Sequence, residues 1–151
     1  FNTFWSYKDF LIFKVKRTGL EGKKIFEIGE KYFFEDIGIR NSIVGYNAND
    51  IHKVLENIVY LHLIMAGYSV TVGVEGKKEV DFVAQKAGEK IYVQVAYMLT
   101  NQETIKREFG NLLEIPDNFP KYVVTMDQIT EISTYKGINR MHVKDFCLKM
   151  V

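Results

Sequence analysis

The sequence predicts an α/β domain with a mixed β-sheet, because helix-like and strand-like patterns alternate along most of the chain. Residues 51–66 carry apolar side chains at helical spacing, and three strand-like segments follow at 68–74, 79–84 and 90–97. A second helical pattern and a further strand pattern come next. This order of helix, three strands, helix and strand is typical of a sheet covered by helices.

The predicted elements begin and end at recognisable caps and turns. Asn49 or Asp50 fits the N-cap of the first helix, and Gly67 is expected to end it. This helix is apolar nearly all round, which indicates packing on more than one side. The second helix is expected over residues 102–113 and the next strand over 121–126, and a last strand and helix fit 138–148.

A β-hairpin is predicted near the N-terminus. An apolar run at 10–16 and an alternating segment at 24–34 flank a connection that contains glycines. Residues 1–9 fit the end of a helix. Because the chain begins with Phe1 rather than Met and opens on aromatic residues, we expect it to be a piece of a longer protein.

Composition excludes several classes of protein. The 151 residues are 47% hydrophobic and 26% charged, which is the balance of an ordinary soluble domain. A net charge of +1 provides no global attraction to nucleic acid or membrane, so any basic surface must be local. The single Cys147 excludes an internal disulfide, and no apolar run is long enough to span a bilayer. We therefore expect a cytoplasmic protein without membrane contacts.

Three polar side chains interrupt apolar segments and are candidate site residues. Glu56 lies in the first helix, Asp81 in the second of the three strands and Gln94 in the third. A buried carboxylate is costly unless it is paired or bound to a metal, so these side chains are expected to meet. Each also has a structural alternative: Asp81 as a hydrogen-bonded strand-end residue, Glu56 as a salt-bridge partner, and Gln94 as an amide bonded to backbone.

This order resembles the PD-(D/E)XK nucleases, in which a helix Glu precedes a strand Asp and an acid-x-Lys strand. Here Glu56, Asp81 and Gln94-Val95-Ala96 occupy those places. More specifically, residues 10–148 resemble an uncharacterised domain that follows the P-loop module in archaeal and bacterial AAA+ ATPases. The segments that carry the resemblance are Lys31-Tyr-Phe-Phe-Glu-Asp-Ile-Gly-Ile-Arg-Asn-Ser-Ile, Leu55-Glu-Asn-Ile-Val-Tyr, Glu79-Val-Asp-Phe-Val, Tyr92-Val-Gln-Val-Ala-Tyr, Arg107-Glu-Phe-Gly-Asn-Leu-Leu and Pro120-Lys-Tyr-Val-Val-Thr-Met-Asp.

The resemblance implies a restriction-endonuclease-like mixed sheet flanked by helices. It also implies that residues 1–35 are the remnant of a winged-helix-like segment with its β-hairpin wing, and that residues 36–151 are the nuclease-like domain. The P-loop ATPase module of the parent chain would be a partner. The sequence has no Gly-x-x-x-x-Gly-Lys-Ser/Thr motif, so we expect no ATP hydrolysis by this chain itself.

A working site of this class holds Mg²⁺ with carboxylates and uses a lysine to position or activate water. Gln94 is neutral and Ala96 stands at the lysine position, so the metal site that Asp81, Gln94 and Glu56 would form is expected to be weak or absent. Mg²⁺ is the cofactor that the resemblance implies. A migrated lysine could compensate, and the candidates are Lys78 and Lys106.

Three functions follow as expectations. The first is an accessory domain of an AAA+ ATPase with a degenerate nuclease site, which binds nucleic acid or another part of its assembly. The second is an active divalent-metal-dependent DNA nuclease. The third is a protein-binding or homo-oligomerisation module, which the aromatic content of 14% favours.

The predicted hairpin is locally basic. Residues 1–31 contain seven Lys or Arg and four Asp or Glu, so their net charge is 7 − 4 = +3. A basic wing suits sequence-independent contacts with phosphates, while lysines on an edge hairpin also prevent aggregation. The candidate nucleic-acid contacts are Lys14, Lys16, Arg17, Lys23 and Lys24.

Overall fold

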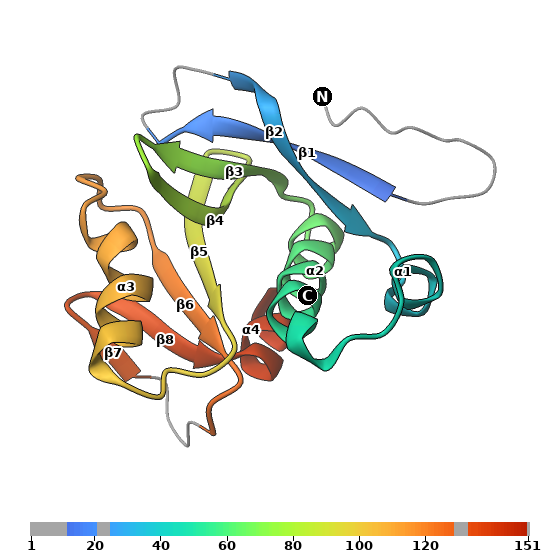
Figure 1. The fold of residues 1–151 in the computed structure, drawn as a ribbon. Helices are drawn as coiled ribbons and strands as arrows, with labels where there is room; N and C mark the ends of the chain where they lie inside the picture. The colour runs from blue at the N-terminus through green and yellow to red at the C-terminus, as the bar shows by residue number, and fades with distance from the viewer. Residues whose placement is uncertain (1–11, 21–24, 129–132, 151) are drawn as a thin grey trace.

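The computed structural model describes residues 12–20, 25–128 and 133–150, which form a mixed α/β fold around one sheet (Figure 1). The strands are β1 (Ile12–Gly19), β2 (Ile25–Phe34), β3 (Ser69–Glu75), β4 (Lys78–Lys86), β5 (Glu89–Ala96), β6 (Lys121–Thr125), β7 (Ser133–Tyr135) and β8 (Ile138–His142). Within the described ranges these eight strands lie in the order β2-β1-β3-β4-β5-β6-β8-β7. The β1/β3, β5/β6 and β6/β8 pairs are parallel and the others are antiparallel, so the sheet is mixed as predicted.

Helices cover both faces of this sheet. They are α1 (Ile37–Val44), α2 (Ile51–Met65), α3 (Gln102–Leu113) and α4 (Val143–Met150), with a short 3₁₀ turn, η1 (Ala48–Asp50), before α2. One core packs under α2 and α4, and a second core lies between the sheet and α3 (Figure 1). The apolar β5 side chains alternate between the cores: Ile91, Val93 and Val95 enter the first, and Tyr92 and Ala96 enter the second. None of the described helices is long and apolar enough to cross a membrane.

Most predicted elements are confirmed. The hairpin, the helix that begins at Ile51, the three following strands and the helix over 102–113 all form where the patterns indicated. Asp50 stands at the N-cap of α2 without a side-chain capping bond; Asn47 instead caps η1 by accepting from the Asn49 N–H at 2.9 Å. Helix α1 and the short strand β7 were not predicted. The helix end expected at residues 1–9 lies outside the described residues.

The β1–β2 hairpin is part of the main sheet. Strand β1 pairs with β2 on one side and runs parallel to β3 on the other. Phe33 of β2 stacks on Tyr60 of α2, with ring centroids 4.5 Å apart. The Asn57 side chain of α2 also bonds both backbone groups of Phe34, accepting from N–H at 2.8 Å and donating to C=O at 2.6 Å. These contacts fix β2 against α2. The domain boundary expected at residue 35 stays a prediction.

Candidate functional site

The candidate site forms where β4 and β5 diverge. Their ladder runs from Lys86 opposite Glu89 to Phe82 opposite Val93. Beyond this point, side chains replace the backbone bonds: the Val95 N–H donates to Asp81 Oδ2 at 2.9 Å. This explains why two polar residues are buried in adjoining strands.

Gln94 completes the same junction from β5. Its Oε1 accepts from the Asp81 N–H at 3.4 Å, so the two side chains each bond the other strand's backbone. Asp81 is 6% exposed and Gln94 is 8% exposed. The alternative proposed for Gln94, an amide bonded to backbone, is therefore confirmed. Asp81 is also hydrogen-bonded to backbone, but it lies inside β4 and not at a strand end.

A β-bulge in β4 determines which side Asp81 faces. The register with β3 shifts between Thr71 and Gly73, so that Asp81 and Phe82 together lie opposite one β3 residue. As a result Val80 belongs to the α3-side core and Phe82 to the α2-side core, although regular alternation would place them together. Asp81 is thus directed toward α2 and the hairpin.

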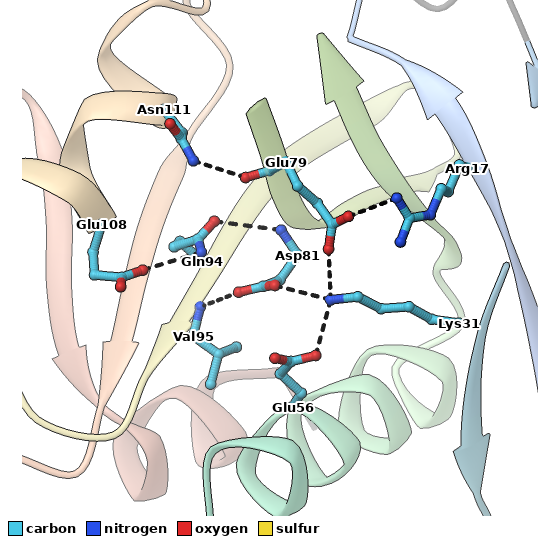
Figure 2. A network of polar contacts seen from close by, with 9 residues as sticks. All are labelled: Arg17, Lys31, Glu56, Glu79, Asp81, Gln94, Val95, Glu108 and Asn111. Atoms are coloured by element: carbon cyan, nitrogen blue, oxygen red, sulfur yellow. Dashed lines mark hydrogen bonds and ion pairs between the residues drawn. The ribbon is translucent and has the colours of Figure 1, made fainter. Parts of the chain in front are cut away.

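Lys31 of β2 lies at the centre of three carboxylates (Figure 2). Its Nζ is 2.8 Å from Glu79 Oε1, 3.0 Å from Glu56 Oε2 and 3.1 Å from Asp81 Oδ1. Arg17 of β1 adds a second cation, with Nη1 at 2.9 Å from Glu79 Oε2. We call these five side chains the Lys31 cluster. The hairpin supplies both of its cations, and β4 and α2 supply its anions.

The charges of the Lys31 cluster nearly balance. Two cations and three carboxylates leave 2 − 3 = −1 when all are ionised. Burial, and then the neighbouring Glu56 carboxylate, raise the pKa of Asp81 to about 7, although Lys31 opposes this. Burial acts to lower the pKa of Lys31, but Asp81, Glu56 and Glu79 outweigh it and the pKa is raised. Asp81 is therefore the group that takes up the excess charge by protonation, while Lys31 stays charged.

A second polar contact extends to the opposite side of the sheet. Gln94 Nε2 donates to Glu108 Oε2 of α3 at 3.1 Å, and Glu108 is 8% exposed. Arg107 binds the other Glu108 oxygen, with Nη2 at 2.8 Å and Nε at 3.0 Å. On the same face of α3, Asn111 donates to the Glu79 carbonyl at 2.9 Å (Figure 2). Helix α3 is thus bonded to both strands at their junction.

These groups border an open pocket of about 550 Å³. Its walls combine acidic side chains from three elements with exposed polar and aromatic groups. The lining residues are His52, Glu56, Asp81, Gln94, Val95, Ala96, Tyr97, Met98, Thr100, Thr104, Arg107 and Glu108. All three predicted site residues and Ala96 are therefore brought together around one cavity.

The two lysines proposed as replacements for the motif lysine lie elsewhere. Lys78 forms an ion pair with Glu114, and Lys106 lines a separate groove along α3 and β7. The lysine that reaches the predicted acids is Lys31, which belongs to the hairpin predicted to be basic. The alternation of β2 indicates that Lys31 faces the interior, because Lys31 shares a strand face with the buried Phe33.

Two acidic residues of the site were also missed. Glu79 lies two residues before Asp81 and joins the same cluster. Glu108 follows Ile105 by three positions and precedes Leu112 by four, so helical spacing aligned it with the buried face of α3. The spacings of Glu79 and Glu108 show which face of the strand or helix each side chain shares. They do not show which partner the side chain contacts.

The basic hairpin residues have mixed environments. Lys14 forms an ion pair with Glu30 at 2.8 Å, and Arg17 forms one with Glu79. Lys16 is exposed on β1. Lys23 and Lys24 lie outside the described residues, so their expected contact with nucleic acid stays a prediction.

The residues at the junction do not fit the Mg²⁺ that the resemblance implies. That ion requires oxygens at about 2.0–2.1 Å in octahedral geometry. The centre of these carboxylates instead holds the Lys31 ammonium, and the second Asp81 oxygen bonds the Val95 N–H. Position 94 offers an amide oxygen that already accepts from backbone. No group of three or more His, Cys, Asp or Glu residues suited to a metal occurs in the described part of the chain.

The fold and the site thus define a mixed α/β domain with a half-buried ion-pair cluster beside a polar pocket. No family model matches the chain. It is similar to an uncharacterized protein of Haemophilus influenzae, with 38% identity over 140 residues. That alignment covers 93% of this chain and 34% of the relative, so the chain spans about a third of the relative's length.

Proposed function

We propose that this domain is a nuclease-like accessory domain of a P-loop ATPase and that it binds nucleic acid without cutting it. One observation carries the proposal. Glu56, Asp81 and Gln94 meet in the order expected of a PD-(D/E)XK site, but internal bonds already engage the groups that cleavage would need. Ala96, at the motif lysine position, is 6% exposed and presents only a methyl group.

The ATPase part of the proposal draws on the chain's resemblance and on the relative's length. About two thirds of the Haemophilus influenzae protein lies outside the match, which is room for a P-loop module. An accessory domain needs to recognise a ligand or a partner and does not need chemistry of its own.

The pocket rim supports nucleic acid as the ligand. The Arg107 side chain is 71% exposed and offers a guanidinium to phosphate, although it also contacts Glu108. Thr100 and Thr104 line the same cavity with hydroxyl groups, and the exposed Tyr97 ring offers a surface for stacking a base. Such contacts favour single-stranded nucleic acid, whose bases are free to stack.

Incubation with labelled single- and double-stranded DNA in Mg²⁺ or Mn²⁺ tests the absence of cutting. We expect wild type and Asp81→Ala to leave both substrates intact. Cleavage by the wild type that Asp81→Ala abolishes would contradict the proposal.

Fluorescence anisotropy with the same DNA tests binding. We expect salt-dependent binding that prefers the single strand and persists in EDTA. Arg107→Ala should weaken it about fivefold, the effect of roughly 1 kcal/mol. Lys106→Ala is the matched control, because it removes the same charge from the neighbouring α3 residue, which lines the second groove only, whereas Arg107 lines both. Equal effects of the two variants, or no binding at low salt, would exclude the pocket rim and favour a protein partner.

An active nuclease is the second candidate, and one observation favours it. Lys31 and Glu108 bring an ammonium and a carboxylate to the site, which are the two groups that positions 96 and 94 lack. If this candidate is correct, the wild type cleaves DNA and both Lys31→Ala and Glu108→Gln lower the rate. Lys78→Ala, which removes a lysine on the surface, should then leave the rate unchanged.

A further inference from the structure

We infer that the Lys31 ammonium is a built-in substitute for a divalent cation, so that the hairpin, rather than a metal, neutralises the acids of this site. The inference deepens the proposed function and rests on it, because it explains how a nuclease-like set of acids is kept without a metal. It also identifies Lys31 as the residue that prevents metal binding.

The coordination of Lys31 supports this role. An ammonium has three N–H donors, and Nζ has three carboxylate oxygens from three residues within 2.8–3.1 Å. The donors therefore match the acceptors in number. The distances suit N–H···O bonds and exceed the roughly 2.0–2.1 Å of Mg²⁺–oxygen bonds.

The route by which Lys31 reaches the acids is also fixed. Two residues further along β2, Phe33 stacks on Tyr60 and contacts Phe82, with ring centroids 5.5 Å apart in the second pair. Asn57 bonds the next residue, Phe34. Apolar and polar contacts therefore both fix the part of β2 that carries Lys31. The ammonium is presented by a packed strand and not by a loop.

The two sources of positive charge exclude each other. A metal ion bound by Glu56, Glu79 and Asp81 would have to displace the ammonium from the same oxygens. Like-charge repulsion between the ion and the displaced lysine would oppose this step. Removing the lysine charge should then leave three carboxylates with Arg17, on Glu79, as the remaining cation of the cluster, and such a set attracts a hard cation.

Mn²⁺ titration of the 151-residue chain, followed by electron paramagnetic resonance or calorimetry, tests the inference. We expect no saturable Asp81-dependent binding by the wild type. Lys31→Met should bind Mn²⁺ more tightly, by on the order of tenfold or more, and the added Asp81→Asn change should abolish the gain. Lys31→Arg, which keeps the charge, and Lys78→Met, which removes a surface lysine, should both behave as the wild type.

If Lys31→Met is unfolded without metal, a refolding experiment with added Mn²⁺, followed by circular dichroism, is equally decisive. Restoration of the fold by Mn²⁺, but not by KCl at equal ionic strength, supports the inference. A Lys31→Met protein that gains neither Mn²⁺ affinity nor Mn²⁺-dependent folding overturns it.

This test can fail independently of the proposed function. A wild type that binds Mn²⁺ through Asp81 but leaves DNA intact would overturn the role of Lys31 and leave the non-cutting domain in place. Asp81-dependent DNA cleavage that persists in EDTA would overturn the non-cutting domain and leave the role of Lys31 in place.

Discussion

The two sides of the sheet stabilise carboxylates in different ways at the same strand junction. On the α2 side, three carboxylates surround Lys31, which belongs to a hairpin distant from β4 in the sequence. On the α3 side, the single carboxylate of Glu108 lies against the neutral amide of Gln94 and an exposed arginine. Gln94 is therefore more than a lost acid. A glutamate there would face Glu108, so the amide is what allows that carboxylate to approach the site.

The largest effect should come from removing the α2-side cation. Lys31→Met leaves the buried Asp81 carboxylate, and the half-buried Glu56 and Glu79, without their shared partner, and breaking a buried ion pair costs about 3–5 kcal/mol. We therefore expect a loss of about 3 kcal/mol or more in the free energy of unfolding, measured with urea at neutral pH in a buffer without divalent cations. A loss below about 1 kcal/mol would mean that water, rather than Lys31, solvates these acids.

The pH dependence of stability tests the same side. Folding raises the pKa of Asp81 from 3.8 to about 7, because burial and Glu56 disfavour its charged form. The stability contributed by this carboxyl is therefore fully present below pH 3.8 and is lost as the pH rises through about 7. The free energy of unfolding of the wild type relative to Asp81→Asn should fall by on the order of a few kcal/mol across this window. A difference that stays constant or rises with pH would contradict the assignment.

The α3 side should respond to an added charge. Gln94→Glu places a second carboxylate beside Glu108 and removes the amide donor, which should destabilise the fold by about 2 kcal/mol at neutral pH. Glu108→Gln in the same chain restores an acid–amide pair and should recover most of the loss. A double-mutant cycle measured by denaturation gives the coupling. Additive losses would show that the two side chains do not sense each other's charge.

The architecture was predictable from the sequence to the extent that it depends on periodicity. The alternation of β5 predicted that Gln94 and Ala96 share a face, and both side chains border the pocket. Helix α1 carried a local signal that was not used: Asp36 accepts from the Ile39 N–H at 2.9 Å and caps it. Strand β7 has three residues, which is too short for a periodic pattern.

The composition of the site was only partly predictable. Glu56 and Asp81 were predicted because a charge inside an apolar segment is visible locally, whereas Glu79 and Glu108 were not. The role of Lys31 was not predicted, because it depends on where the hairpin packs and on the β4 bulge that directs Asp81 toward α2 and the hairpin. Both arise from packing between segments far apart in the sequence, so no local pattern states which lysine meets which acid.

The smallest effect should come from an ion pair outside both regions. Lys78 and Glu114 have exposed side chains, and surface pairs contribute less than about 1 kcal/mol. Lys78→Met should therefore change the free energy of unfolding by less than about 0.5 kcal/mol in the same urea titration. A loss as large as that of Lys31→Met would remove the distinction between buried and surface lysines on which the comparison depends.

The most direct measurement is anomalous diffraction from wild-type crystals grown in MnCl₂. We expect no manganese peak among Glu56, Glu79 and Asp81, and a Lys31 ammonium that remains within hydrogen-bond distance of all three. A manganese peak between these carboxylates, with the lysine displaced, would contradict the claim that the hairpin supplies the cation of this site.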